Sequence, residues 1–342
     1  MSGILLFAFP ALAILLCLAI NSRRKIDILV LIHALLHSGL GCYAYLKRGG
    51  LLGMDDLGLF AFLIISALYA AIAFYRLGNN DSSTIKNYRI HSIFLMIFIM
   101  AMDGAAIARD LGLIWVFVEA TTITSALLIS YSNSKKSLEA AWKYLFICSV
   151  GIALAFVGIL LLVIAQPETA TLLISKIDLG SISPFWLKIS FVFILIGFGT
   201  KMGLAPLHFW MPDAYSEAPA PILALLSGAL LNIALIPILR VDKLMRQSGM
   251  GDLVQELYLL MGMLSVFVAA VFMLRTKDYN RLLAYSSIEN MGLIMIAFGV
   301  GGMAYYAGFL HILGHSLIKA AFFLTAGNAL VIYQDKNYQN TG

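Results

Sequence analysis

Long apolar stretches recur along the whole chain, and they constrain its fold more than any other feature. About 20 apolar residues in an α-helix are enough to cross the roughly 30 Å hydrocarbon core of a bilayer. Stretches near this length lie at residues 4–20, 26–46, 57–77, 90–108, 111–131, 142–165, 184–205, 219–239, 257–274, 282–300 and 303–332. The sequence therefore predicts an all-α polytopic membrane protein with about 11 transmembrane helices.

Composition excludes the other broad fold classes. Only 12% of the 342 residues are charged, whereas soluble domains contain about 25%, and the mean hydropathy is +0.92. A membrane β-barrel is excluded because the apolar stretches do not alternate with a period of two and are about twice as long as a barrel strand. No soluble nucleotide-binding domain or long linker interrupts the helices.

Charge and cysteine usage exclude two function classes. The net charge of +5 is spread over short loops and forms no continuous basic stripe, so the sequence does not indicate nucleic-acid binding. Cys17, Cys42 and Cys148 each lie inside an apolar stretch, without a paired cysteine or a nearby histidine. They read as packing residues, and we expect no cofactor or metal in this chain.

The loop charges predict how the chain is oriented in the membrane. Loops after odd-numbered helices carry 13 Lys and Arg, against 8 in loops after even-numbered helices. By the positive-inside rule the odd loops are cytoplasmic and the N-terminus is outside. The first stretch is followed, not preceded, by a basic cluster at residues 23–25, which is the reverse of a cleaved signal peptide, so we expect it to remain as a helix.

Several ionisable residues lie inside the predicted helices. Each costs about 2.5–3.5 kcal/mol at the centre of a membrane helix, so a partner, a wet cavity or a function is expected for each. Lys201 is surrounded by Gly197, Gly199 and Gly203, with Pro206 and Pro212 beyond, a pattern typical of a broken helix that lines a cavity. The candidate site residues are Glu119, Lys201, Glu289, His311, His315 and Lys319.

The last three candidates have a spacing that suggests proton transfer. His311, His315 and Lys319 stand four residues apart, so they form one polar stripe on a helix face. The alternative for the histidines is hydrogen bonding between helices, and for Glu119 it is a buried carboxylate that only locks packing. His33 and His37 have the same spacing, and we interpret them as structural. Asp103 is compatible with an interfacial cap or a functional carboxylate.

A glutamate and a lysine in this setting can move a proton. Burial disfavours the charged form of both groups, while an opposite charge at about 4 Å and an effective dielectric near 20 contributes about 4 kcal/mol. Lys201 would therefore take up a proton when Glu119 is close and release it when Glu119 moves away. The released proton needs a polar path, which Glu289 and the stripe on residues 311–319 could supply.

Five segments carry a resemblance to a known family. The chain resembles the antiporter-like subunits shared by respiratory complex I, Mrp-type cation/proton antiporters and membrane-bound hydrogenases, and is most similar to the hydrogenase-4 component F type. The segments are LGLIWVFVEATTITSALLI, AAWKYLFICSVGIALAF, KMGLAPLHFWMPDAYSEAPAP, RLLAYSSIEN and HILGHSLIKAAFFLTAGNAL, within residues 110–329.

This resemblance implies a fold and a function. It implies a 14-helix fold with two inverted five-helix repeats, each with a broken helix and a proton half-channel. It assigns Glu119 and Lys201 as the paired carboxylate and broken-helix lysine, and His311, His315 and Lys319 as the central relay. It also implies that proton pumping is driven by electron transfer in attached hydrophilic subunits, which alone carry the iron–sulfur and metal centres.

The chain departs from the family pattern at its C-terminal end. It stops before the expected second broken helix, so we expect an incomplete fold: N-terminal helices in residues 1–108, the first repeat in 109–240 and part of the second in 241–342. In helix eight, Asn232 stands where some relatives have a lysine or histidine. The alternatives to a proton-translocating oxidoreductase subunit are an Mrp-type cation/proton antiporter subunit and an inert membrane scaffold.

Overall fold

The computed structural model describes residues 2–46, 52–78, 83–166 and 170–333, and the description below concerns these residues. Their fold is all α: no strand forms in them, and the extended backbone makes only two isolated bridges, Leu52 to Ala108 and Asp110 to Leu173. Ten helices are long and apolar enough to cross a membrane, and a shorter apolar helix covers Leu5–Ala19. The predicted polytopic α-helical class is confirmed.

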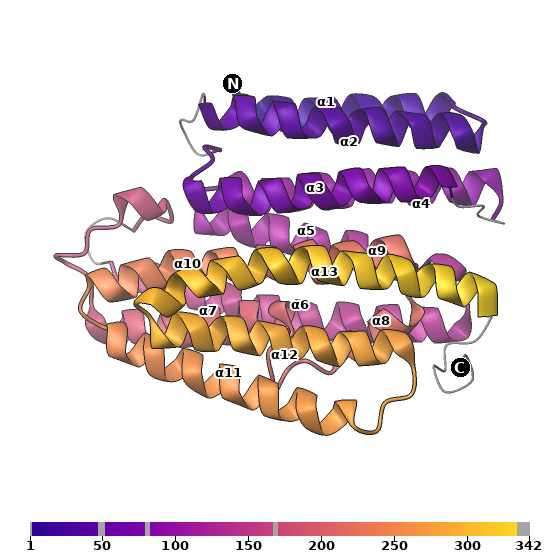
Figure 1. The fold of residues 1–342 in the computed structure, drawn as a ribbon. Coiled ribbons are helices and arrows are strands. Elements are labelled where there is room, and N and C mark those ends of the chain that lie inside the picture. Colours follow the sequence, from indigo (N-terminus) through magenta and orange to yellow (C-terminus); the bar gives the residue numbers. More distant parts are fainter. Residues whose placement is uncertain (1, 47–51, 79–82, 167–169, 334–342) are drawn as a thin grey trace.

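The helices run nearly parallel or antiparallel to one another in a stacked bundle (Figure 1). Their bounds are α1 Ser2–Ala19, α2 Arg23–Leu46, α3 Asp56–Gly78, α4 Ile85–Ile107, α5 Leu111–Ile129, α6 Lys135–Ile164, α7 Pro184–Met202, α8 Trp210–Glu217, α9 Ala220–Leu225, the π-helix η3 Leu226–Leu230, α10 Leu231–Gln247, α11 Gly251–Met273, α12 Tyr279–Val300 and α13 Met303–Tyr333. Short 3-10 turns follow α5 (Ser130–Ser132) and precede α7 (Ile174–Lys176).

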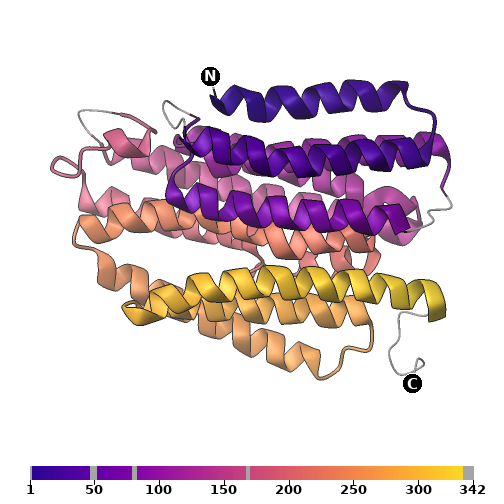
Figure 2. The ribbon, with the colours of Figure 1, turned by 45° about the horizontal axis from the view of Figure 1, so that its top comes forward.

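The bundle has an N-terminal and a C-terminal edge. Both views place α1 and α2 at one edge and α11 and α12 at the opposite edge, with α13 lying across α12 (Figures 1 and 2). The segment Ala220–Gln247, which comprises α9, η3 and α10, occupies the centre, because its most apolar window is completely buried. By contrast, only 22% of the α11 window is buried, as expected for a helix that faces lipid or another helix.

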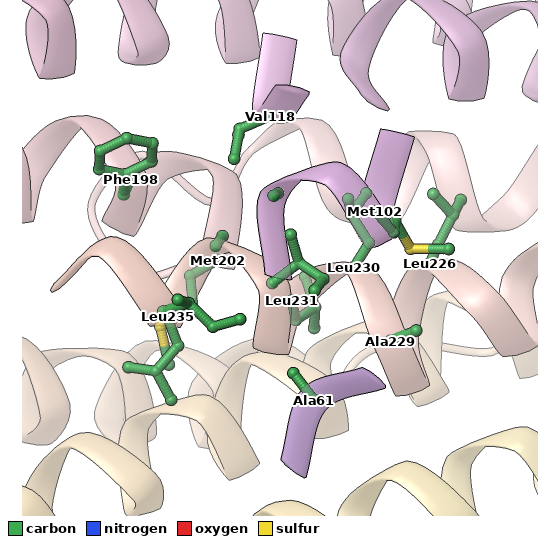
Figure 3. Packing of buried hydrophobic residues seen from close by; sticks show 14 of the residues in the cluster. Ala61, Met102, Val118, Phe198, Met202, Leu226, Ala229, Leu230, Leu231 and Leu235 are labelled. Carbon is green, nitrogen blue, oxygen red and sulfur yellow. The ribbon is translucent and has the colours of Figure 1, made fainter. Parts of the chain in front are cut away.

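Buried aliphatic side chains hold the central segment in place. Figure 3 shows Leu226, Leu230 and Leu235 of this segment beside Met102 of α4 and Met202 of α7, all of them at most 2% exposed. Since lipid tails are as apolar as leucine, helices in a membrane associate chiefly through close packing and polar contacts. The central segment is therefore fixed by side chains that fit against four or more neighbouring helices.

Glycines bring the outer helix pairs into close contact. A Cβ atom on Gly262 of α11 would lie 2.7 Å from the carbonyl oxygen of Gly292 in α12, and one on Gly292 would lie 2.8 Å from the Gly262 oxygen. Between α6 and α7, a Cβ on Gly197 would lie 2.4 Å from the backbone nitrogen of Ala155. Small residues at such crossings allow backbones to approach, as in other membrane helix pairs.

Several helices extend beyond the apolar stretches that predict them. Helix α4 begins at Ile85 and not at 90, because Thr84 caps it by accepting a hydrogen bond from the Asn87 backbone. Ser134 caps α6 in the same way, so this helix starts at Lys135, and α10 continues to Gln247. Hydropathy reports only the lipid-embedded part of a helix, whereas caps and polar turns continue it into the interface.

Candidate functional site

The predicted broken helix is present, and it places Lys201 at an interruption inside the bundle. Helix α7 ends at Met202 because Gly203 adopts the left-handed conformation at φ 81°, with its N–H donating to the carbonyls of Gly199 and Thr200. A Cβ on Gly203 would lie 2.1 Å from Cε of Met211, so glycine is required there. Lys201 thus lies in the last turn of α7, where a helix dipole favours a cation.

Helix α8 resumes after a short loop and anchors the broken end. The indole Nε1 of Trp210 donates a hydrogen bond to the carbonyl of Thr200 at 2.9 Å. This carbonyl is one of the groups that a helix C-terminus leaves without an intrahelical partner. The sequence pattern of glycines and prolines therefore predicted the break correctly, while the tryptophan that secures it was not identified.

Lys201 is completely buried and is held by neutral hydroxyl groups. Its Nζ donates to Oγ1 of Thr122 in α5 at 2.9 Å and to the hydroxyl of Tyr144 in α6. The Tyr144 hydroxyl is also hydrogen-bonded to Oγ of Ser125 at 2.6 Å. Each of these four side chains is 0% exposed. Three helices thus meet at one ammonium group.

Glu119 lies next to this site but does not form an ion pair with Lys201 in the described structure. Its Oε1 accepts a hydrogen bond from Oγ of Ser149 in α6 at 2.7 Å, and its Oε2 is buried without a hydrogen-bond partner. Glu119 stands three residues before Thr122, on the same face of α5. In place of the direct pair that the resemblance implies, Lys201 donates a hydrogen bond to Thr122, and Glu119 acts on it electrostatically.

The remaining predicted residues gather in a second group around α13. His315 and Lys319 are 4% and 2% exposed, and His311 is half-buried. The Nζ of Lys319 donates to the carbonyl of Leu283 in α12 at 3.2 Å, and Glu289 of α12 acts on it electrostatically. Nε2 of His311 donates to Oδ1 of Asn290 at 2.8 Å.

His315 points at the irregular turn η3. Its Nε2 donates to the carbonyl of Ser227 at 3.3 Å, and its Nδ1 is buried without a partner. The hydroxyl of Ser227 is hydrogen-bonded to Ser287 at 2.9 Å, and Ser287 donates to the carbonyl of Leu283, which also accepts from Lys319. Single π-turns inside helices often mark functional positions. This turn joins His315 and Lys319 in one hydrogen-bonded group.

Asn232 also belongs to the surroundings of the second group. Its Nδ2 donates to the Gly228 carbonyl and to Oγ of Ser316, both at 2.8 Å, while Oδ1 is buried without a partner. The position where some relatives carry a cation therefore faces the residue next to His315. The amide supplies polar contact without a charge.

Aromatic side chains lie between the two groups. Tyr144 packs edge-on against Trp210 with ring centroids 4.9 Å apart, Trp210 against Tyr215 at 6.3 Å, and Tyr215 against Phe323 of α13 at 5.4 Å. The Tyr215 side chain is completely buried, and its hydroxyl lies next to the Ser227 side chain of the second group. No hydrogen bond among the described residues links Lys201 to His315 directly, so this aromatic layer separates the two groups.

The structure also distinguishes between the two interpretations of Asp103, an interfacial cap or a functional carboxylate. This carboxylate is 0% exposed, and its Oδ2 accepts a hydrogen bond from Nε2 of His37 at 2.7 Å. The cap at this end of the bundle is Asp110, which accepts from the Leu113 backbone at 3.0 Å. The interfacial-cap alternative for Asp103 is therefore wrong, because its side chain faces the interior.

A cavity reaches the bundle from the end at which α8 stops. It has a volume of about 320 Å³, and its largely apolar lining includes the polar side chains of Arg76, Tyr88, His91, Glu217 and Tyr279. Among the described residues, no three His, Cys, Asp or Glu side chains converge as metal ligands would. Neither Lys201 nor Lys319 lines this cavity. The hydroxyls around Lys201 suit both states of the lysine, since a hydroxyl accepts from an ammonium and donates to an amine.

Comparisons with known proteins agree with this arrangement. Residues 108–341 match the family described as NADH:quinone oxidoreductase/Mrp antiporter, TM. The chain is 35% identical to the hydrogenase-4 component F homolog of Methylacidiphilum infernorum (isolate V4), over 96% of this chain and 72% of the relative. It is 31% identical to hydrogenase-4 component B of Escherichia coli (strain K12), over 81% of this chain and 43% of the relative.

Solved structures share the fold. A chain of the membrane-bound sulfane sulfur reductase, an archaeal respiratory membrane complex, superposes with a TM-score of 0.88 over 99% of this chain and 73% of that one, at 23% identity. A chain of the Mrp complex from Dietzia sp. DQ12-45-1b gives a TM-score of 0.78 over 96% of this chain and 37% of that one, also at 23% identity.

Proposed function

Because the chain belongs to the NADH:quinone oxidoreductase/Mrp antiporter transmembrane family, we propose that it translocates protons within a multisubunit hydrogenase-4-like or complex-I-like oxidoreductase. The observation that carries this proposal is the burial of Lys201 among hydroxyl groups, without a counter-ion in direct contact. A buried charge without its own partner is costly. The protonated and neutral forms of Lys201 can therefore interconvert when the surroundings change slightly.

The carboxylate of Glu119 can change the surroundings of Lys201. Glu119 has one oxygen bonded to Ser149 and one oxygen free in the interior. Movement of Glu119 toward Lys201 stabilises the ammonium, and movement away favours the amine, with a Coulomb interaction of about 4 kcal/mol at 4 Å and a dielectric near 20. Each cycle of movement would load one proton and release it toward the group formed by His315 and Lys319.

The proposal includes partners and an orientation. Other membrane subunits are expected beside this chain, since the superposed chains come from multisubunit membrane complexes. Hydrophilic redox subunits would carry the iron–sulfur and metal centres and drive the cycle. From the positive-inside rule we expect the N-terminus to be outside and the cavity beside Glu217 to open on the cytoplasmic face of a bacterial or archaeal membrane.

Two alternative functions predict different roles for the same buried residues. An Mrp-type cation/proton antiporter subunit belongs to the same family as the matched model, and it would produce sodium-dependent pH changes in vesicles without an electron donor. An inert scaffold would need none of the buried charges. The test is donor-driven proton uptake by vesicles that contain the assembled complex.

Glu119→Gln and Lys201→Ala should abolish that uptake, while Lys188→Ala should leave it unchanged. Lys188 is an exposed lysine on the same helix, α7, so it controls for the loss of a positive charge there. Uptake that is unaffected in both buried-site variants would overturn the proposal in favour of the scaffold. Sodium-driven pH changes without the donor would favour the antiporter.

A further inference from the structure

A buried polar cluster in the N-terminal helices takes no part in the function proposed above. It consists of His33 and His37 from α2, Ser66 and Tyr69 from α3, and Asp103 from α4, and each side chain is at most 2% exposed. Helix pairs α2 and α3, and α2 and α4, pack directly against each other. The cluster therefore lies inside the layer that Figure 1 shows at the edge away from α11 and α12.

Hydrogen bonds connect its members in two sets, one around each histidine. Nε2 of His37 donates to Oδ2 of Asp103 at 2.7 Å, and Nδ1 of His37 lies 2.8 Å from Oγ of Ser66. Nδ1 of His33 lies 2.8 Å from the hydroxyl of Tyr69, and the two imidazole rings are 6.2 Å apart. A His–carboxylate contact of this length and burial is a strong, charge-assisted hydrogen bond when the imidazole is protonated.

Two polar atoms of the cluster are buried without a hydrogen-bond partner. They are Oδ1 of Asp103, an acceptor, and Nε2 of His33. Buried polar atoms are almost always satisfied, and an exception points to an ordered water, an ion or a functional proton. A metal ion does not fit, because His33, His37 and Asp103 do not converge as a set of three ligands. Protons and water are the ligands that these atoms can take.

We propose that His33, His37 and Asp103 form a second proton-binding site, separate from the one at Lys201. One proton makes the His37 imidazolium and the Asp103 carboxylate a neutral pair. A further proton must go to His33, where the nearby His37 imidazolium disfavours it. The cluster therefore holds one proton, shared by His37 and Asp103, while His33 stays neutral beside it.

Aromatic side chains surround both imidazoles. Phe62 stacks on His37 with centroids 4.5 Å apart, and Phe9 of α1 stacks on His33 at 5.0 Å, so aromatic rings cover both imidazoles. The other titratable groups near the cluster are Cys17 of α1 and Arg76 of α3, which act electrostatically on Tyr69. Arg76 is itself paired with Asp27 of α2 at 3.1 Å.

Two contacts join this site to the centre of the bundle. A Cβ on Gly228 in η3 would lie 2.6 Å from Cδ1 of Leu68, which stands between Ser66 and Tyr69 on α3. Arg240 of α10 donates to the backbone carbonyl of Ala106, three residues after Asp103. A change in the charge of the cluster would therefore act on the helix that supplies the partner of His315.

The protonation states can be measured directly with histidine labelled in its ring nitrogens. The full chain in lipid nanodiscs would be titrated from about pH 5 to 9, with the ring signals assigned by replacing each of the six histidines with glutamine in turn. We expect His37 to be an imidazolium at neutral pH, held by the Asp103 carboxylate 2.7 Å away, and His33 to stay neutral over the whole range. A single neutral tautomer for both rings over the whole range would overturn the proposal.

Asp103→Asn tests the partnership within the site. It should convert His37 to a neutral imidazole at neutral pH, with loss of its imidazolium signal. Asp110→Asn removes a carboxylate that caps α5, and it should leave His37 unchanged. An imidazolium that persists in Asp103→Asn would contradict the pairing, and the wild-type titration decides the question if that variant does not fold. Neither measurement depends on proton translocation through Lys201.

Discussion

Thr122→Val is the sharpest test of how Lys201 carries a proton. Valine keeps the shape of the threonine side chain but removes the Oγ1 atom that accepts from Nζ at 2.9 Å. A hydrogen bond to a charged group contributes about 1.5–3 kcal/mol, and about 1.4 kcal/mol corresponds to a factor of ten in an equilibrium. The ratio of ammonium to amine at Lys201 should therefore fall by about 10- to 100-fold.

The sign of the effect on proton uptake follows from this loss. Because the hydrogen bond from the ammonium to Thr122 is charge-assisted and stronger than any bond to the neutral amine, its removal lets Lys201 lose its proton at lower pH. The alkaline limb of donor-driven proton uptake should move toward lower pH by about one to two units, as follows from the same free energy. The assay is the rate of uptake by vesicles with the assembled complex, measured over a range of pH.

Thr121→Val provides a matched control on the same helix. Thr121 is also 0% exposed, but its hydroxyl donates only to the carbonyl of Val118 at 2.6 Å, within α5 itself. The two variants lose the same atom from adjacent buried positions, so a general effect on packing would appear in both. An alkaline limb that does not move in Thr122→Val, or that moves equally in Thr121→Val, would refute the role of this hydrogen bond.

Two further predictions address the charge at Lys201 and the packing of the outer helices. Lys201→Arg should reduce donor-driven uptake at least about tenfold, because arginine keeps its proton at any physiological pH; full uptake would contradict lysine deprotonation. Gly262→Ala should lower the free energy of unfolding by about 1–3 kcal/mol through its clash with α12, whereas Gly314→Ala, with no atom within 4 Å of the added Cβ, should be neutral or slightly stabilising. Equal denaturation midpoints for the two glycine variants would show that the contact between α11 and α12 is not tight.

The helices were predictable because the bilayer demands long apolar runs, but their ends were not. Helix α6 begins seven residues before the apolar stretch at 142 and α10 ends eight residues after the one at 239. Those additional turns contain Lys and Arg that reach the interface, where a helix is stabilised by caps and not by hydropathy. A window that measures only apolar content cannot detect them.

The charged residues of the site were predictable for a similar reason, while their partners were not. A lysine or glutamate inside an apolar stretch is conspicuous because burying it is costly. Thr122, Tyr144 and Ser227 are unremarkable at helical positions, and each meets its charged partner across 57 to 88 residues of sequence. Asp103 was ambiguous because its meaning depends on His37, which lies 66 residues away.

Both groups of buried charge lie beside an interruption of regular helix. Lys201 stands in the last turn of α7 before Gly203, and His315 binds a carbonyl of the π-helix Leu226–Leu230. Non-helical backbone inside a membrane persists only where protein or water satisfies its polar groups. In a continuous helix the backbone carbonyl oxygens accept intrahelical hydrogen bonds, whereas at these interruptions they are available to side chains. Because Trp210 secures one interruption through the Thr200 carbonyl, a small shift of α8 changes the end of α7 that carries Lys201. The surroundings of the buried lysine therefore depend on the position of this backbone break, and not only on the groups that touch its ammonium.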